Sequence, residues 1–245
     1  MTDDLCCPIL ELRQYTLHPG RREPLIDLFD REFVETQEAA GMRVVGQFRD
    51  QNRPDYFVWV RGFRDMPSRA AALTEFYDGP LWAEHRSAAV ANMIDFDDVL
   101  LLRPVDDGSG FGLPPVGRPA HRPGVAASSL IAVTVYHLDH AVDTEFRQFF
   151  TARVEPALRR NGITPIARLQ TEPSENTFPD LPVRTGEQVF VWFARFTDPD
   201  QHRRQLSRFE STPEWTDELR PELAKRLSAP TQQLALTPTA RSLLR

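Results

Sequence analysis

The chain has 245 residues, of which 41% are hydrophobic and 26% are charged, so it can form one large globular domain or two small ones. Its formal net charge is −6 and its basic residues are scattered along the sequence, which excludes a nucleic-acid backbone as an expected partner. No apolar run approaches the roughly 18 residues of a membrane span, and Asp3 and Asp4 stand where a secretory signal would be basic. We therefore expect a cytoplasmic protein without a membrane span.

The first strand and first helix predicted from the sequence occur twice. LRQYTL at 12–17 matches VTVYHL at 133–138, and LIDLFDREFV at 25–34 matches FRQFFTARVE at 146–155. Both matches have the same offset of 121 residues. A repeat in the same order at one offset indicates an internal duplication.

The later elements repeat as well, at a larger offset of 133 residues. YFVWVRGF at 56–63 matches VFVWFARF at 189–196, and FYDGPLW at 76–82 matches FESTPEW at 209–215. The second copy therefore carries 12 extra residues, the difference between the offsets 133 and 121, and they lie within 171–187.

Each copy is predicted to run strand, helix, strand, strand, helix, strand, because short β-branched runs alternate with runs of helical apolar spacing. Gly41 and Gly162 follow the first helices and suit a left-handed C-cap. The fourth strands are expected at 99–105 and, more weakly, at 232–238. This is the order of the ferredoxin-like βαββαβ unit.

The predicted fold class is therefore α+β, with two tandem ferredoxin-like βαββαβ halves at 1–105 and 130–245, and a Pro/Gly-rich linker at 106–129. Such a sheet carries its helices on one face and must bury the other. We expect the two sheets to pack face to face as an intrachain pseudo-dimeric α+β barrel whose central space holds a small molecule. Edge strands can also pair between two chains, so a homodimer is a further expectation.

Strand alternation selects candidate residues on the first strands. Glu11, Arg13 and Tyr15 share one face, and Thr134 and Tyr136 occupy the corresponding face of the second copy. We assign this face to the lumen of the barrel. A carboxylate, a guanidinium and a phenol would there either brace the two sheets as an ion pair or contact a ligand.

The orientation of the third strands is less clear, because Arg61 lies on one face and Arg195 places a charge on the other face in the second copy. We assign Trp59, Arg61 and Trp192 to the lumen.

The extra loop at 171–187 carries Phe178 among prolines and is long enough to fold over a barrel mouth. It could equally cover a sheet edge or contact a second chain.

Metal and cofactor sites are not expected. The six histidines include no close pair on one helix face, and His137 and His140 stand in a predicted turn. Cys6 and Cys7 are adjacent, cannot link distant segments, and are expected to be two thiols of a reducing compartment.

Several segments resemble the bacterial branch of the NIPSNAP family, in its tandem form: 11–23, 41–50, 57–63 and 76–104 in the first half, and 176–184 and 190–196 in the second. The resemblance implies the fold of dimeric α+β barrel proteins and little chemistry. Related barrel families include cofactor-independent monooxygenases, cyclases and haem-handling enzymes, and no catalytic motif can be carried over.

We therefore expect a NIPSNAP-like protein that binds a small, largely apolar or aromatic molecule in the barrel without a metal. The alternative is a cofactor-independent monooxygenase or cyclase-type enzyme acting on an aromatic or polyketide-like substrate, with Arg13 and Tyr15 polarising a substrate oxygen. A third hypothesis, haem binding, would need an axial ligand such as His137. The candidate ligand-binding residues are Glu11, Arg13, Tyr15, Trp59, Arg61, Tyr136, Trp192 and Phe178.

Overall fold

The computed structural model describes residues 6–113, 117–122, 124 and 127–245. Residues 1–5 of the predicted first domain, and 114–116, 123 and 125–126 of the predicted linker, lie outside the described residues. In the first half the elements are β1 (Ile9–Leu17), α1 (Arg22–Leu28), the π-helical turn η1 (Phe29–Phe33), α2 (Val34–Ala39), β2 (Arg43–Asp50), β3 (Tyr56–Phe63), α3 (Met66–Tyr77), α4 (Pro80–Val90) and β4 (Met93–Pro104). In the second half they are β5 (Leu130–His137), α5 (Thr144–Phe149), η2 (Phe150–Val154), α6 (Glu155–Arg160), β6 (Pro165–Thr171), β7 (Val189–Phe196), α7 (Pro199–Glu210), η3 (Glu214–Leu219), α8 (Arg220–Ala224) and β8 (Gln232–Pro238).

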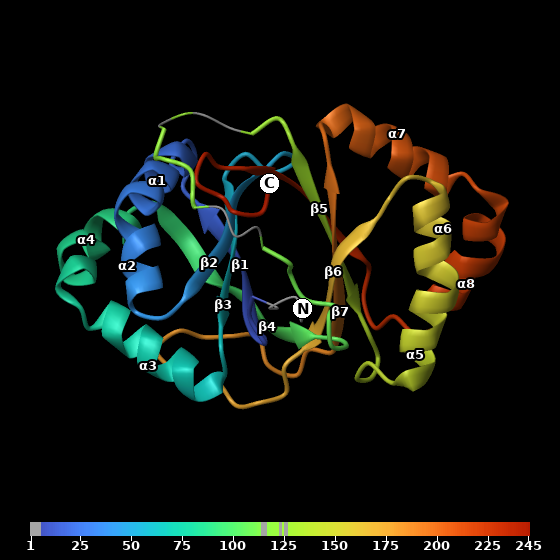
Figure 1. The fold of residues 1–245 in the computed structure, drawn as a ribbon, viewed down its shortest axis with the longest axis horizontal. Helices are drawn as coiled ribbons and strands as arrows, with labels where there is room; N and C mark the ends of the chain where they lie inside the picture. The colour runs from blue at the N-terminus through green and yellow to red at the C-terminus, as the bar shows by residue number, and fades with distance from the viewer. Residues whose placement is uncertain (1–5, 114–116, 123, 125–126) are drawn as a thin grey trace.

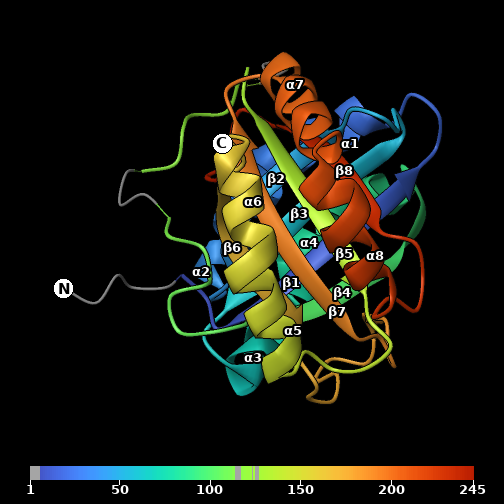
Figure 2. The same cartoon turned by 90° about the vertical axis from the view of Figure 1, so that its right-hand side faces the viewer.

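The eight strands of the described residues close into one antiparallel barrel in the order β1, β3, β2, β8, β5, β7, β6, β4. The halves join where β2 pairs with β8 and where β4 pairs with β6. Helices α1–α4 cover one side of the barrel and α5–α8 the opposite side (Figure 1). Figure 2 looks onto α5–α8, which lie across the strands of the second half. The α+β architecture and the closure of the barrel within one chain agree with the sequence analysis.

Local signals explain why corresponding elements begin and end alike. Asp65 and Asp198, which are 133 residues apart, each accept a hydrogen bond from a backbone N–H in the first turn of α3 and α7. Gly41 and Gly162 have φ values of +95° and +86°, the left-handed conformation expected after the first helices. Strand β4 begins at Met93, six residues before the start predicted from the apolar run at 99–105.

The interior of the barrel is a packed hydrophobic core, so the central space that we expected is absent from the described part of the chain. Side chains from both halves meet there and are almost fully buried, among them Leu10, Leu12, Val58, Val60, Val133, Val135, Val191 and Phe193. Filling a barrel of this strand number with side chains leaves little room for a ligand.

Our assignment of strand faces was therefore wrong. Glu11, Arg13 and Tyr15 on β1, with Trp59 and Arg61 on β3, point outward against the helices. In the second half Tyr136 and Trp192 likewise pack with the helix layer, and so does the face that carries Thr134. The opposite face of these strands, whose side chains in the first strands are uncharged, fills the lumen. Nearly every residue of β1, β3, β5 and β7 is buried, on the helix side and on the barrel side alike, so polarity is a poor guide to which face is which.

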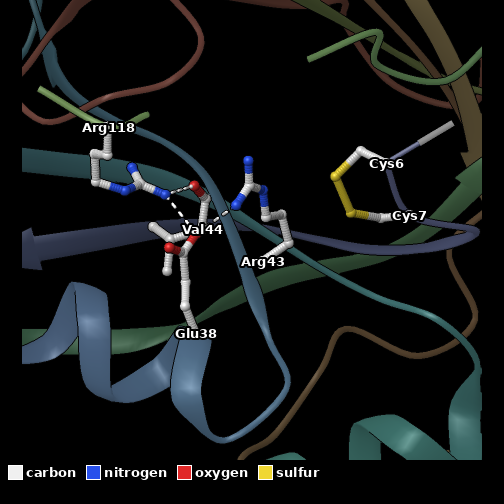
Figure 3. The surroundings of a disulfide bond; sticks show 6 residues. All are labelled: Cys6, Cys7, Glu38, Arg43, Val44 and Arg118. Atoms are coloured by element: carbon white, nitrogen blue, oxygen red, sulfur yellow. Dashed lines mark hydrogen bonds and ion pairs between the residues drawn. A yellow bond between two sulfur atoms is a disulfide. The ribbon is translucent and has the colours of Figure 1, made fainter. Parts of the chain in front are cut away.

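The segments flanking the first half add two contacts. Cys6 and Cys7 are joined in a disulfide just before β1 (Figure 3), so the expectation of two free thiols was wrong. Cys7 is buried and its side chain lies against Gly62 of β3. In the linker, Arg118 donates hydrogen bonds of 2.6 Å to Glu38 Oε1 and to the carbonyl oxygen of Val44 (Figure 3). In the described residues, no helix combines the length and apolarity needed to cross a bilayer.

Candidate functional site

A buried cluster of charged residues lies between the first-half sheet and its helices. The carboxylate of Glu11 is at its centre. Its Oε2 accepts hydrogen bonds of 2.7 Å from both Arg13 Nη1 and Arg61 Nε, and its Oε1 accepts one of 2.6 Å from Arg69 Nε. All four side chains have an exposed fraction of 0%. We call these four residues the charge cluster.

Strand pairing and helix packing assemble the charge cluster. Glu11 on β1 stands opposite Arg61 on β3 in the antiparallel register. Arg13 lies two residues along β1, on the same face. Arg69 is on the buried face of α3 with Leu73 and so reaches down to the sheet.

The charge cluster has an excess of positive charge, with three guanidinium groups around one carboxylate. Burial by itself would raise the pKa of the Glu11 carboxyl, but Arg61, Arg13 and Arg69 together hold it well below its ordinary value. Burial lowers the pKa of Arg69, and the neighbouring cations Arg61 and Arg13 lower it further against the pull of Glu11. Glu11 therefore stays ionised and compensates only part of the charge.

Two donors of the charge cluster are not used. Arg61 Nη2 and Arg69 Nη2 are buried and have no hydrogen-bond partner among the residues that the structure describes. Arg61 Nη1 lies 3.3 Å from Gln37 Oε1 and 3.5 Å from the Tyr77 hydroxyl, at the long end of the hydrogen-bond range. A buried donor without a partner costs about 1–3 kcal/mol, so the cluster is expensive to maintain.

A pocket of about 290 Å³ opens beside the charge cluster, and we call it the aromatic pocket. It lies between α3, α4, the start of β4 and the loop at 171–187. Its lining residues are Tyr15, Tyr77, Asp78, Trp82, Arg86, Val90, Met93, Phe96, Phe178, Asp180 and Leu181.

Tyr15 and Tyr77 connect the aromatic pocket to the charge cluster. The Tyr15 hydroxyl accepts a hydrogen bond of 3.0 Å from Arg13 Nε, and the Tyr77 hydroxyl lies next to Arg61. Burial raises the pKa of Tyr15, so its phenol keeps its proton at neutral pH. A tyrosine that accepts from an arginine can still donate its own proton to a ligand.

The loop at 171–187 belongs to the second half but closes over the first. Arg69 Nη1 donates to Asn176 Oδ1 at 2.9 Å and to Thr177 Oγ1 at 3.1 Å. The ring of Phe178 lies 5.9 Å from that of Tyr77.

The backbone of the loop also donates to β4, from Glu172 N–H to the Leu101 carbonyl and from Arg184 N–H to the Val99 carbonyl, both at 2.9 Å. The loop therefore covers an edge of β4 as well as the aromatic pocket, and not the mouth of the barrel.

The second half provides an internal comparison for the charge cluster. Ala132 stands opposite Ala194 in the register that pairs Glu11 with Arg61. At the two repeat offsets Thr134 corresponds to Arg13, and His202 corresponds to Arg69. The second half thus forms the same strands and helices without the charges.

The cavity of the second half that corresponds to the aromatic pocket is also smaller. It measures about 160 Å³ and is lined by Tyr136 and Trp215, the repeat equivalents of Tyr15 and Trp82, and by Glu210 in place of Tyr77. The excess charge and the larger pocket are therefore properties of the first half.

The structure brings some of the predicted site residues together and separates others. Glu11, Arg13 and Arg61 form the charge cluster, Tyr15 and Phe178 line the aromatic pocket, and Trp59 packs beneath it against Tyr15, with ring centroids 6.0 Å apart. Tyr136 and Trp192 lie in the second half, away from this site.

The candidate residues chosen from the sequence did not include Arg69, Tyr77, Trp82 or Phe96. The sequence did contain a signal for Arg69. It stands at helical spacing from Leu73 and Phe76, and therefore on the helix face that is expected to be apolar.

The histidines, cysteines and acidic residues of the described chain are the candidate ligands for a metal ion or a haem iron. They contain no group of three or more His, Cys, Asp or Glu side chains arranged to hold a metal ion. His137, the axial ligand that haem would need, lies with Nδ1 3.2 Å from Glu187 Oε2 and is not among the residues lining the aromatic pocket.

Comparisons with known proteins bear on the fold and on the first half. The family model described as NIPSNAP matches residues 10–107. No curated protein matches the chain.

Among solved structures, the encapsulated DyP-type peroxidase from Mycobacterium smegmatis is 14% identical, with a TM-score of 0.57 over 97% of this chain and 94% of that one. A dye-decolorizing peroxidase from Bacteroides thetaiotaomicron is 11% identical, with a TM-score of 0.54 over 98% of this chain and 96% of that one. An anthrone oxidase-like protein is 10% identical, with a TM-score of 0.52 over 98% and 94%. At these identities the likeness shows the dimeric α+β barrel fold alone.

Proposed function

We propose that this chain, whose residues 10–107 form a domain of the NIPSNAP family, binds a small, largely apolar or aromatic molecule in the aromatic pocket. The observation that carries the proposal is the pocket itself, in which Tyr77, Trp82, Phe96 and Phe178 surround a polar floor at Tyr15. Sites for small molecules commonly combine apolar and aromatic walls with a few oriented polar groups, and this volume lies near the lower end of their usual range of about 300–1,000 Å³. The proposed ligand is accordingly the size of one or two fused aromatic rings.

Titration with 1-naphthamide, a neutral two-ring probe, tests the proposal by isothermal calorimetry. We expect saturable binding with one molecule per chain, weakened at least tenfold by Trp82→Leu. The matched control is Trp215→Leu, which changes the corresponding tryptophan of the second half and should leave the affinity within twofold. Equal effects of the two substitutions, or no saturable binding of this probe or of its acid, 1-naphthoate, would contradict the proposed site.

The second candidate is a cofactor-independent monooxygenase or cyclase-type enzyme acting on an aromatic or polyketide-like substrate. The hydrogen bond from Arg13 to the Tyr15 hydroxyl favours it, because a phenol held in this way can polarise a substrate oxygen. We expected this reaction in the lumen, but it would have to take place in the aromatic pocket. Of Arg13 and Tyr15, Tyr15 is the one that lines this pocket. Oxygen consumption with an anthrone-type substrate, abolished by Tyr15→Phe, would support this candidate over simple binding.

We also propose that the chain arose by tandem duplication of a ferredoxin-like unit, with domains at 1–105 and 130–245. The order β4, β1, β3, β2 in the first half and β8, β5, β7, β6 in the second supports this origin. Cytoplasmic location and a homodimer are further proposals, to be checked by fractionation of the source cells and by light scattering.

A further inference from the structure

We propose that the ligand of the aromatic pocket carries one acidic oxygen group, a carboxylate or a phenolate. This group accepts hydrogen bonds from the hydroxyls of Tyr15 and Tyr77, beside the buried arginines. This inference rests on the proposed function and specifies the class of ligand that the same pocket takes.

The first argument is the charge of the floor. Arg13, Arg61 and Arg69 are fully buried around Glu11 alone, which leaves an uncompensated charge of two within one layer of side chains. Buried charges are normally balanced by partners, and an incoming anion would supply the missing balance.

The second argument is the position of the two phenols. Tyr15 and Tyr77 both line the aromatic pocket, and the hydroxyl of each contacts a guanidinium of the charge cluster. Each hydroxyl that accepts from an arginine has its own proton free to donate to an oxygen of the ligand. Hydrogen bonds to an ionised acceptor are shorter and stronger than neutral ones, so this arrangement favours an anion over a neutral oxygen.

The third argument is that the same order of strands and helices forms in the second half without these charges. The second half builds the same strands and helices with Ala132, Thr134, Ala194 and His202 at the corresponding positions. Buried ion pairs can often be replaced by uncharged groups without loss of stability, and the second half carries no Glu or Arg at these four positions.

The charges at the rim of the pocket do not reverse this preference. Asp78, Asp180 and Arg86 also line the pocket, but all three are exposed. Water and salt screen exposed charges, whereas the floor lies in a region of low dielectric where each charge acts more strongly.

A comparison of 1-naphthoate with 1-naphthamide at pH 7 tests the inference by isothermal calorimetry, because the two probes have nearly the same shape and only the first is charged. We expect naphthoate to bind at least tenfold more tightly, which corresponds to about 1.4 kcal/mol. Tyr15→Phe keeps the ring and removes the hydroxyl, and should reduce the preference to less than threefold. Tyr136→Phe makes the same change in the second half and should leave the preference intact.

Each outcome decides the matter. Equal affinities for the two probes, both weakened by Trp82→Leu, would overturn the inference and leave the proposed function standing. A preference for naphthoate that survives Tyr15→Phe, in a variant whose melting temperature shows that it is folded, would also overturn it. Failure of both probes to bind would remove the proposed function and the inference together.

Discussion

The carboxylate of Glu11 on β1 holds the guanidinium of Arg69 on α3, with 2.6 Å between Glu11 Oε1 and Arg69 Nε and both side chains fully buried. This contact fastens the first-half helix layer to its sheet. Arg69 also donates to Asn176 and Thr177 in the loop at 171–187. One buried carboxylate therefore supports the sheet, the helix and the loop that together form the aromatic pocket.

We expect Glu11→Gln to lower the free energy of unfolding by about 3–5 kcal/mol, because it leaves three buried guanidinium groups without a counter-charge. Urea denaturation at pH 7 would measure the loss. The control is Glu214→Gln, whose side chain is 41% exposed and pairs at 2.6 Å with Arg160, which is 58% exposed. Screening by solvent should limit that loss to less than about 1 kcal/mol. Similar losses for the two variants would show that the charge cluster is not a structural centre.

The buried carboxyl of Asp30 in η1 should make stability depend on pH. Burial raises its pKa to about 6, although the hydrogen bond from Thr239 and the nearby Arg241 lower it in part. A carboxyl with a raised pKa binds more protons in the folded state than in the unfolded state, so its contribution to stability falls as pH rises from about 4 to about 6. Asp30→Asn removes this penalty. We expect the variant to gain about 2 kcal/mol relative to the parent between pH 4.5 and pH 7, measured by urea denaturation at both values. A stability difference that is the same at both pH values would contradict the assignment.

The loop at 171–187 should loosen when Asn176 is replaced by alanine. Its side chain accepts from Arg69 Nη1 at 2.9 Å and from the Phe178 N–H at 3.1 Å, and donates to the Leu181 carbonyl at 2.9 Å. Such bonds contribute about 0.5–1.5 kcal/mol each. We expect faster amide hydrogen exchange across the loop in Asn176→Ala and an affinity for 1-naphthamide reduced roughly tenfold. The neighbouring exposed Glu175, changed to alanine, serves as the control and should alter neither measurement.

The two helix-ending glycines should respond differently to the same substitution. Both have positive φ, which costs a residue with a side chain about 1–2 kcal/mol. A Cβ at Gly41 would meet only Ala72 Cβ at 3.9 Å, whereas one at Gly162 would lie 2.6 Å from Gln205 Nε2. The terminal amide of Gln205 must move aside, so Gly162→Ala should lower the melting temperature slightly more than Gly41→Ala, and the added loss should disappear in the double variant with Gln205→Ala. An equal effect of the two single variants would contradict this placement of Gln205.

Much of the fold followed from the repeat. The matched segments predicted the order of strands and helices, and the weak run at 232–238 corresponds to β8. The offsets also located the extra loop of the second copy. These features depend on residues that are close in the sequence, such as the capping Asp65 or the turn at Gly41, and so they can be predicted from the sequence.

The candidate site was predicted only in part. Strand alternation placed Glu11, Arg13 and Tyr15 on one face, and the structure keeps them together. Arg69 and Trp82 come from helices whose positions over the sheet depend on the packing of the whole first half. Phe178 comes from the other half of the chain, so only the closed barrel brings it to Tyr77.

By itself the sequence determined which side chains share a face of each strand, because alternation is a property of the extended backbone. Only the tertiary structure decided which face turns toward the helices and which toward the lumen. The usual signal for that choice is the contrast between a buried face and a wet one, and here both faces are buried. Leu12 and Gln14 therefore fill the barrel, while Glu11, Arg13 and Tyr15 lie under the helices beside the aromatic pocket.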